Sequence, residues 1–398
     1  YTMSIVNPNS STTGGAATAD DQVIFIAEDV SITNPSGSAF EFGNLENVQI
    51  FVEGYVASSR PSSTTDLGSG ILGIGPSNFV QISETGLVAG EFGVALEGGS
   101  GEITNHGIID GRTTGVVLSG SSGQLFNHGT IEGGRLAGAA GVVLSGPSAS
   151  AYNYGAIQGQ IGILSSGIGG VIFNLGSIVG TGSAGINVVA SGKSVINDGD
   201  IRSATSDGIA GDQGLHLENN GEISGVTGVA LVASTASADH IVLNSGTITG
   251  ETNGLLLAGG EIQSITNSGM IQSTSDWAIE VGSTGFSDLV LINTGTIQST
   301  SGNGILGTDA ASSSDTIVSS GGIFGVVSLL AGNDLVQMQE GGFVVGGIEL
   351  GAGDDIAFGA GDADVIDGGG DNDFIVGGGG VDVLSGGSGI DIILGGTG

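Results

Sequence analysis

The chain has 398 residues, of which 81 are glycine and none is cysteine, and its 40 acidic residues against 5 lysines and arginines give a net charge of −35. This charge disfavours binding to nucleic acid and to anionic membranes, which are negatively charged themselves. The lack of cysteine excludes disulfides, and no stretch reaches the roughly 20 consecutive apolar residues of a transmembrane segment.

Abundant glycine with few aromatic residues is typical of an all-β solenoid, because thin coils are filled by stacked aliphatic side chains. At the amino end, residues 1–21 are polar and are predicted to form an arm. Residues 23–26 alternate as an opening strand would. The first coil is therefore expected to begin near residue 22.

Two weak copies of a repeat follow the opening strand. Residues 48–57 align with residues 80–89, which predicts that the two segments lie in neighbouring coils. The intervening residues 58–66 are too polar for the wall of a coil, so they are expected to form a lateral loop.

A stronger repeat begins near residue 100, with an Asn followed two places later by Gly and four places later by Ile. Each period of 21–26 residues also holds two further apolar runs. Three short strands per coil predict a right-handed parallel β-helix over residues 22–325. The repeated asparagines are Asn105, Asn127, Asn153, Asn174, Asn197, Asn219, Asn244, Asn267 and Asn293.

Each position of this repeat has a predicted role in the coil. The Ile is expected to stack on its counterpart in the next coil and form an interior ladder. The Asn is expected to hydrogen-bond along the axis as a buried amide ladder. The Gly is expected to adopt the left-handed backbone conformation of a corner, and the residue between Asn and Gly is expected to face solvent.

The carboxy-terminal part has a period of nine residues. After a transition over residues 326–349, the pattern G-G-x-G-x-D-x-U-x is complete at residues 377–385 and 386–394, and weaker copies fill residues 350–376. Two such units make one turn of a flattened coil, a parallel β-roll. Asp373 and Asp391 are therefore expected on one side of the roll, and Asp364 and Asp382 on the other.

This spacing indicates calcium, Ca2+, a hard cation that takes six to eight oxygen ligands. Glycines let backbone carbonyls crowd toward one point, and the Asp of each unit adds a charged oxygen. The candidate ligands are Asp334, Asp355, Asp362, Asp364, Asp371, Asp373, Asp382 and Asp391. Asp362 and Asp371 stand where the pattern has its third glycine, which makes the turn geometry there less regular.

Residues 350–398, about an eighth of the chain, resemble the RTX family of hemolysin-type calcium-binding repeat proteins. The resemblance implies export by type I secretion, folding on meeting calcium outside the cell, and an extracellular or cell-surface location. It says little about activity, because toxins, proteases, lipases, epimerases, adhesins and surface-layer proteins carry such repeats. Together with the upstream β-helix, the chain resembles secreted bacterial surface-layer, filament or adhesin proteins.

The sequence contains few candidate catalytic residues. Only the face near His106, Asp110, Arg112, His128 and Arg135 combines acids, bases and histidines. His106 and His128 occupy the same corner of successive coils and should lie about 5 Å apart, as solvent-facing residues without a catalytic role. His216 and His240 are read as structural or exposed. The chain is expected not to be an enzyme, and no catalytic residue is assigned.

The favoured interpretation is a secreted, calcium-stabilised structural protein that associates with itself into a surface layer or filament. The alternatives are a polysaccharide lyase or epimerase and a glycan-binding adhesin, with a cell-surface polysaccharide as partner. Because the sequence starts at Tyr1 without a signal peptide and stops at Gly398 within a repeat, it is expected to be part of a longer protein.

Overall fold

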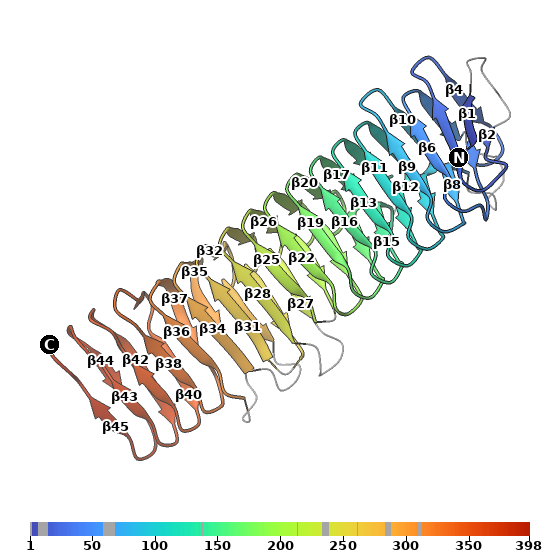
Figure 1. The fold of residues 1–398 in the computed structure, drawn as a ribbon. Helices are drawn as coiled ribbons and strands as arrows, with labels where there is room; N and C mark the ends of the chain where they lie inside the picture. Colours follow the sequence, from blue (N-terminus) through green and yellow to red (C-terminus); the bar gives the residue numbers. More distant parts are fainter. Residues whose placement is uncertain are drawn as a thin grey trace. The chain divides into compact units, whose positions relative to one another are not determined.

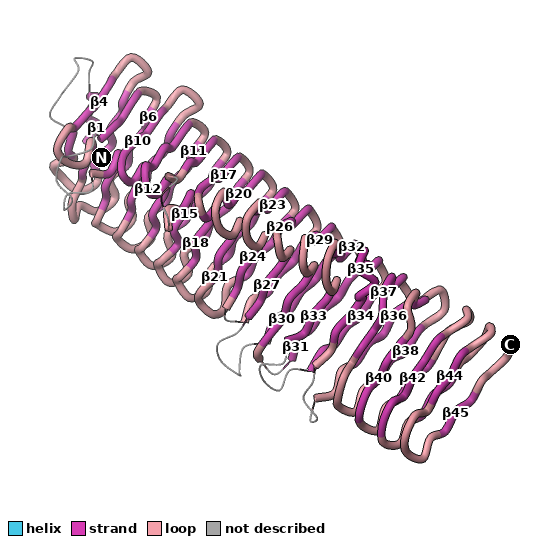
Figure 2. Tube along the Cα trace, turned by 180° about the vertical axis from the view of Figure 1, so that it is seen from behind, coloured by secondary structure: helices cyan, strands magenta, loops and turns pink. Residues whose placement is uncertain are grey.

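The computed structural model describes residues 2–6, 15–58, 68–134, 136, 138–212, 214–232, 239–260, 262–282, 288–308 and 313–398. Two compact units, Tyr1–Ser206 and Asp207–Gly398, divide the chain. The described residues form strands, turns and loops without a helix, and paired strands run parallel (Figures 1 and 2). The prediction of an all-β parallel β-solenoid is confirmed.

Unit 1, Tyr1–Ser206, has three walls of parallel strands. The first wall stacks β1 (Thr2–Val6), β3 (Gln22–Ile26), β6 (Gln49–Val52), β9 (Phe79–Ile82), β11 (Glu102–Asn105), β13 (Gln124–Asn127), β16 (Ser150–Asn153), β19 (Val171–Asn174) and β22 (Ser194–Asn197). The second stacks β4 (Ser31–Asn34), β7 (Tyr55–Ser58), β10 (Leu87–Leu96), β12 (Ile108–Leu118), β14 (Thr130–Glu132), β17 (Ala156–Gly159), β20 (Ser177–Gly180) and β23 (Asp200–Ser203).

The third wall of unit 1 shares the long strands β10 and β12, each of which continues from the second wall into the third. Its other strands are β2 (Gly15–Ala16), β5 (Phe40–Glu41), β8 (Ser69–Gly73), β15 (Ala140–Leu144), β18 (Ile161–Ser165) and β21 (Ile186–Val188). The predicted three strands per coil are therefore present.

Unit 2, Asp207–Gly398, repeats this plan. Its first wall stacks β25 (His216–Asn219), β28 (His240–Asn244), β31 (Ile262–Asn267), β34 (Asp288–Asn293), β36 (Thr316–Ser319), β38 (Leu335–Met338), β41 (Ile356–Phe358), β43 (Phe374–Val376) and β45 (Ile392–Leu394). The second stacks β26 (Glu222–Gly225), β29 (Thr247–Gly250), β32 (Met270–Ser273), β35 (Thr296–Leu306), β37 (Gly322–Ser328) and β39 (Phe343–Val344).

The third wall of unit 2 again shares two long strands, β35 and β37, with the second. Its others are β24 (Ile209–Gly211), β27 (Val229–Val232), β30 (Leu255–Ala258), β33 (Ile279–Gly282), β40 (Ile348–Ala352), β42 (Val365–Gly370) and β44 (Val383–Ser385). From β41 onward each coil has only two strands, the flattened coil that the nine-residue period predicts.

The core is a set of aliphatic ladders. In unit 1 the Ile of the Asn repeat pairs in register from coil to coil and is 0% exposed in each, at Ile109, Ile131, Ile157, Ile178 and Ile201. In the same coils, Tyr154 and Leu175, which lie between Asn and Gly, are 40% and 53% exposed. The inward Ile and the outward spacer residue are both confirmed.

The asparagines form buried ladders inside both units. Between Asn105 and Asn197, and again between Asn219 and Asn293, the amide nitrogen donates to the side-chain oxygen of the Asn in the next coil at 2.7–2.8 Å. In unit 2 the ladder runs from Asn219 and ends where Asn293 donates to the hydroxyl of Ser319 at 3.0 Å. The predicted amide ladder is confirmed, and a serine ends it.

The prediction for the glycine after each Asn is wrong. Gly129 and its equivalents do not have a positive φ. They are glycines because a Cβ at Gly129 would collide with the carbonyl oxygen of Gly107 in the preceding coil. The left-handed corner lies at the start of the first-wall strands, where Ser122 and Ser148 have φ values of 58° and 57°.

The amino-terminal coils depart from the sequence-based register in one wall. Tyr55 pairs with Leu87 as the alignment of the weak copies predicts, but Ile50 pairs with Val80 instead of Ile82. Because side chains alternate between the two faces of a strand, a shift of two residues keeps the same side chains inward. The hydrophobic pattern of the sequence is therefore the same for both registers. Residues 2–6, assigned to the arm, form β1 and pair with β3. The predicted lateral loop lies largely outside the described residues.

A lysine is buried in the wall of unit 1. Lys193 is 1% exposed, and its ammonium donates to the carbonyl oxygen of Ala149 at 3.0 Å. Burial lowers the pKa of Lys193 to about 8. Between this value and the unfolded pKa of about 10.4, the unfolded chain binds a proton that the native chain does not.

The free energy of unfolding of unit 1 is therefore expected to rise with pH from about 8 to 10. Lys193→Met is expected to raise it by about 2 kcal/mol at pH 7, because a buried charge is removed, and to flatten the pH dependence. Urea unfolding at several pH values measures both effects. A wild-type stability that does not change over this range would contradict the assignment.

Candidate calcium site

The aspartates of the nine-residue repeats stack into two columns. Asp373 and Asp391 precede β43 and β45 in the first wall, and Asp364 and Asp382 precede β42 and β44 in the opposite wall. Oδ1 of each Asp accepts the backbone N–H of the Asp one coil earlier, at 3.1 Å from Asp373 to Asp391 and from Asp364 to Asp382. The predicted division between the two sides is confirmed.

The first-wall column continues upstream of the nine-residue repeats. The N–H of Asp355 donates to Asp373 at 3.0 Å, and that of Asp334 donates to Asp355 at 2.7 Å. One coil earlier, Asp315 donates to Asp334 at 2.8 Å. Sequence reasoning missed Asp315, although Asp315-Thr-Ile-Val has the same D-x-U-x pattern as Asp373-Phe-Ile-Val.

Most of these carboxylates are buried without a countercharge. Asp315, Asp334, Asp355 and Asp373 are at most 2% exposed, and Asp364 is 4% exposed. Within the described chain, the second oxygens of Asp334, Asp355 and Asp373 have no hydrogen-bond partner. No lysine or arginine follows Arg202 in the sequence, so unit 2 has neither residue to neutralise the column.

The cost of burying these carboxylates as anions is seen in their raised pKa values. Burial raises the pKa of Asp334 to about 8 and that of Asp355 to about 6, and neighbouring aspartates add to both shifts while a backbone N–H opposes them. Burial also raises the pKa of Asp364 and Asp373. Stacked buried anions without a cation are unfavourable. A bound cation would remove this electrostatic repulsion and the cost of burying the charges.

Glycines beside the columns lie close to the aspartate carboxylates and to backbone carbonyl oxygens. A Cβ added at Gly368 would collide with the Asp373 carboxylate and lie 2.8 Å from the carbonyl oxygen of Gly386. The same holds at Gly377, with the Asp382 carboxylate and the carbonyl of Gly395 at 2.8 Å. A carboxylate and a carbonyl of the next coil thus both lie close to the glycine Cα, and oxygens of these two kinds are ligands that calcium takes.

This arrangement differs from a cluster of side-chain ligands. Among the described residues, no three His, Asp or Glu side chains gather as a metal-binding group. Calcium takes backbone carbonyls and water as readily as carboxylates, so a repeat with one Asp per nine residues is compatible with it. The residues that would hold such an ion are the column aspartates together with the glycine carbonyls.

Two of the candidate ligands lie apart from the columns. Asp362 and Asp371 are exposed at the corners. Asp371 has a φ of 70°, so it adopts the left-handed conformation of the glycine it replaces. Asp362 and Asp371 are close enough to contribute to the raised pKa values of Asp364 and Asp373, respectively.

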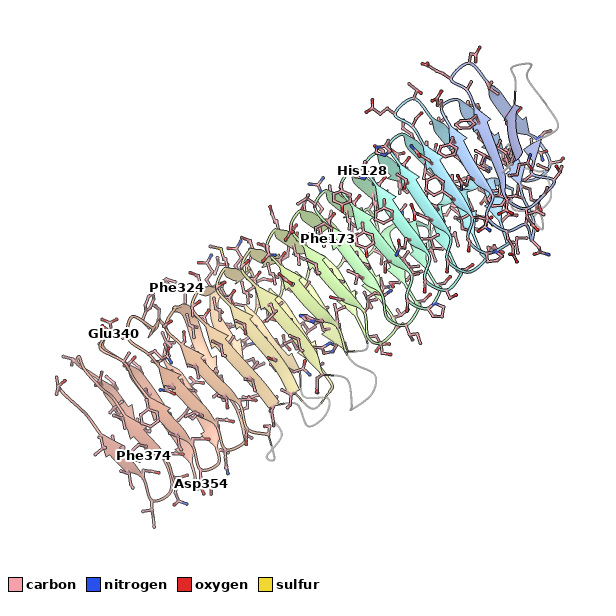
Figure 3. All side chains as sticks on the ribbon, in the orientation of Figure 1. His128, Phe173, Phe324, Glu340, Asp354 and Phe374 are labelled. Atoms are coloured by element: carbon pink, nitrogen blue, oxygen red, sulfur yellow. The ribbon has the colours of Figure 1, made fainter. Side chains whose placement is uncertain are left out.

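Among the candidate enzymatic residues that the structure describes, the two corner histidines form a stack, and Asp110 and Arg112 line one hollow. The rings of His106 and His128 stack with centroids 4.7 Å apart, as expected, and His128 stacks in turn on Tyr154 at 4.6 Å (Figure 3 labels His128). Partial burial, then the neighbouring His106, lower the pKa of His128. Arg135 lies outside the described residues, His216 is exposed, and His240 is buried.

The described part of the chain contains no helix long and apolar enough to cross a membrane. Comparisons with protein-family models, with curated proteins and with solved structures each found no match.

Proposed function

We propose that the chain is an extracellular structural protein of the RTX type, which folds fully on binding calcium and associates with other copies into a layer or filament at a bacterial surface. The buried aspartate column carries the proposal. Three of its oxygens have no hydrogen-bond partner among the described residues, and no lysine or arginine follows Arg202 in the sequence. Extracellular calcium modules bind at about 0.1–1 mM, a concentration found outside cells.

Support for self-association comes from the outer face of the final coils. Rows of apolar side chains run across β41, β43 and β45. Ile356 and Phe358 are 41% and 36% exposed, and Ile392 and Leu394 continue their two rows; Figure 3 labels Phe374 in the same strands. Contiguous exposed apolar surface of this kind marks protein contacts. The net charge of −35 opposes contact between copies until cations bind.

Calcium binding is tested by titration calorimetry on the whole chain, with Gly377→Ala and Gly361→Ala as a matched pair. A Cβ at Gly377 would occupy the space between Asp382 and the Gly395 carbonyl, whereas a Cβ at Gly361 meets no atom within 4 Å. We expect Gly377→Ala to weaken calcium binding at least tenfold and Gly361→Ala to leave it unchanged. Wild-type protein that takes up no calcium at 10 mM would refute the calcium part.

Association is tested separately by sedimentation and negative-stain imaging in millimolar calcium and after chelation. We expect ordered sheets or fibres that dissolve on chelation. Ile392→Asp is expected to bind calcium normally and to stay dispersed, because the apolar face then carries a charge. Calcium-loaded wild-type protein that stays monomeric at high concentration would refute assembly while leaving calcium binding intact.

A further inference from the structure

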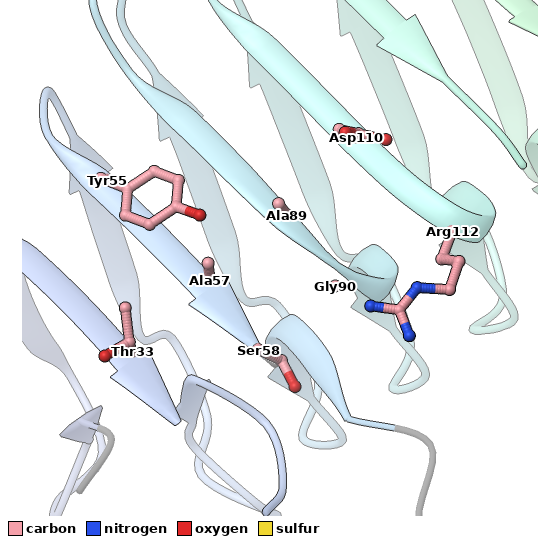
Figure 4. Close-up of a pocket in the computed structure, with 8 residues that line it drawn as sticks. All are labelled: Thr33, Tyr55, Ala57, Ser58, Ala89, Gly90, Asp110 and Arg112. Carbon is pink, nitrogen blue, oxygen red and sulfur yellow. The ribbon is translucent and has the colours of Figure 1, made fainter. Parts of the chain in front are cut away.

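A hollow lies on the outer surface of unit 1, over the second wall (Figure 4). Across strands β4, β7, β10 and β12, one outward row reads Thr33, Ala57, Ala89 and Asp110. The two alanines form a low floor of small side chains. The volume of about 390 Å³ falls in the range of about 300–1,000 Å³ of small-molecule sites.

The sides of the hollow differ in chemistry. Tyr55 lies on one side and Arg112 on the other, with Ala57 and Ala89 between them (Figure 4). Tyr55 is 38% exposed. Asp110 stands beside Arg112 on the same strand and is exposed. An aromatic ring, a carboxylate and a guanidinium thus border a single small hollow.

The ring of Tyr55 belongs to no stack of rings, unlike several rings of the later coils of unit 1. Phe126 stacks on Tyr152 with an interplanar angle of 9°, and His128 stacks on Tyr154 with an angle of 4°. Rings stacked face to face along the axis offer mainly their edges to a ligand. Among the ring pairs of the described residues Tyr55 takes no part, and its neighbours in the adjacent coils are Ser31 and Leu87, neither of which is aromatic.

The charges define which ligand fits. Arg112 is paired with Glu91 at 3.6 Å, and its side chain is still 42% exposed. Asp110 lines the hollow beside Arg112, whose charge is already paired with Glu91 outside the lining, so the hollow offers an anionic ligand no unpaired positive charge. The charge around the hollow therefore disfavours the binding of anionic ligands such as phosphates and uronic acids. A carboxylate that accepts and a guanidinium that donates instead suit the neighbouring hydroxyls of a sugar.

We propose that the hollow binds a neutral hexose unit of a polysaccharide. The apolar C–H face of the sugar ring packs on Tyr55, and its hydroxyls bond to Asp110 and Arg112. The alanine floor admits the ring, and because the hollow is open at the surface, the polysaccharide continues outward on either side. This site goes beyond the structural role, since it gives unit 1 a ligand of its own.

The test is titration calorimetry of the calcium-loaded chain with neutral hexaoses of glucose, mannose and galactose, and with hexagalacturonate as the acidic counterpart. We expect at least one neutral hexaose to bind with a submillimolar Kd, and hexagalacturonate to bind at least tenfold more weakly. Tyr55→Ala should weaken binding at least tenfold. Ala89→Leu should abolish it by filling the floor without removing a contact group.

Tyr154→Ala is the matched control, because Tyr154 is 40% exposed yet lies outside the hollow. It is expected to bind like the wild type, and circular dichroism verifies that each variant keeps its strands. Three results would overturn the proposal: none of the neutral hexaoses binds at millimolar concentration, hexagalacturonate binds more tightly than they do, or Ala89→Leu binds as well as the wild type.

Discussion

Asp355→Asn is expected to change the stability of unit 2 with opposite signs in the two calcium states. Without calcium, the change removes a buried charge and keeps an oxygen that can accept the N–H of Asp334. The free energy of unfolding should then rise by about 1–2 kcal/mol. With calcium, the variant should lose about 2–3 kcal/mol of the stabilisation that a hundredfold excess of ligand over Kd supplies.

Urea unfolding followed by circular dichroism, in chelator and in excess calcium, measures both changes. Glu349→Gln is the control, because Glu349 is an exposed acid on β40 outside the columns. It should change stability by less than about 0.5 kcal/mol in either state. If Asp355→Asn changes the free energy of unfolding in the same direction in both states, the Asp355 carboxylate serves only as a hydrogen-bond acceptor and does not bind calcium.

Asn153→Ala is expected to lower the free energy of unfolding of unit 1 by about 4 kcal/mol. The amide of Asn153 accepts from Asn127 at 2.7 Å and donates to Asn174 at 2.8 Å. It also donates to the carbonyls of Gly155 and Ser177. Truncation leaves buried partners above and below unpaired, and each costs about 1–3 kcal/mol.

The matched control is Asn187→Ala, because Asn187 lies at the outward-facing middle position of β21. Thermal and urea unfolding should show a change below about 0.5 kcal/mol for this variant. A cost for Asn153→Ala as small as that of the control would show that the ladder follows from the fold without stabilising it.

Features that recur in every coil, and whose residue type has a clear chemical role, could be predicted from the sequence. The Asn ladder and the inward Ile follow from a side chain that must hydrogen-bond or be buried at the same place in every coil. The two aspartate columns follow from the nine-residue period, because two units make one turn. These features depend on spacing alone, so no knowledge of neighbouring coils is needed.

Other features depend on the distance between coils, which the spacing of residues does not contain. The glycine after each Asn was assigned a left-handed backbone, but its lack of a side chain is required by the carbonyl of the preceding coil. Asp315 was missed because no glycine-rich turn precedes it, although it extends the same column. Similarly, the hollow beside Tyr55 arises from alanines in two different coils.

The two proposed roles use different units. The buried carboxylates that we propose bind calcium are in unit 2, where the sequence has no lysine or arginine, and the hollow that we propose binds a neutral sugar is in unit 1. A surface protein with this division would hold its structure through calcium while contacting a polysaccharide through the β-helix. Each role can therefore be removed by substitution without removing the other.

The most direct measurement is amide hydrogen exchange of the whole chain in millimolar calcium and after chelation, resolved by peptide. We expect strands β38, β41 and β43 to be protected only with calcium, since these strands follow the buried carboxylates of Asp334, Asp355 and Asp373. The coils of unit 1 should be protected equally in both states. Equal protection of the carboxy-terminal strands with and without calcium would contradict calcium-dependent folding.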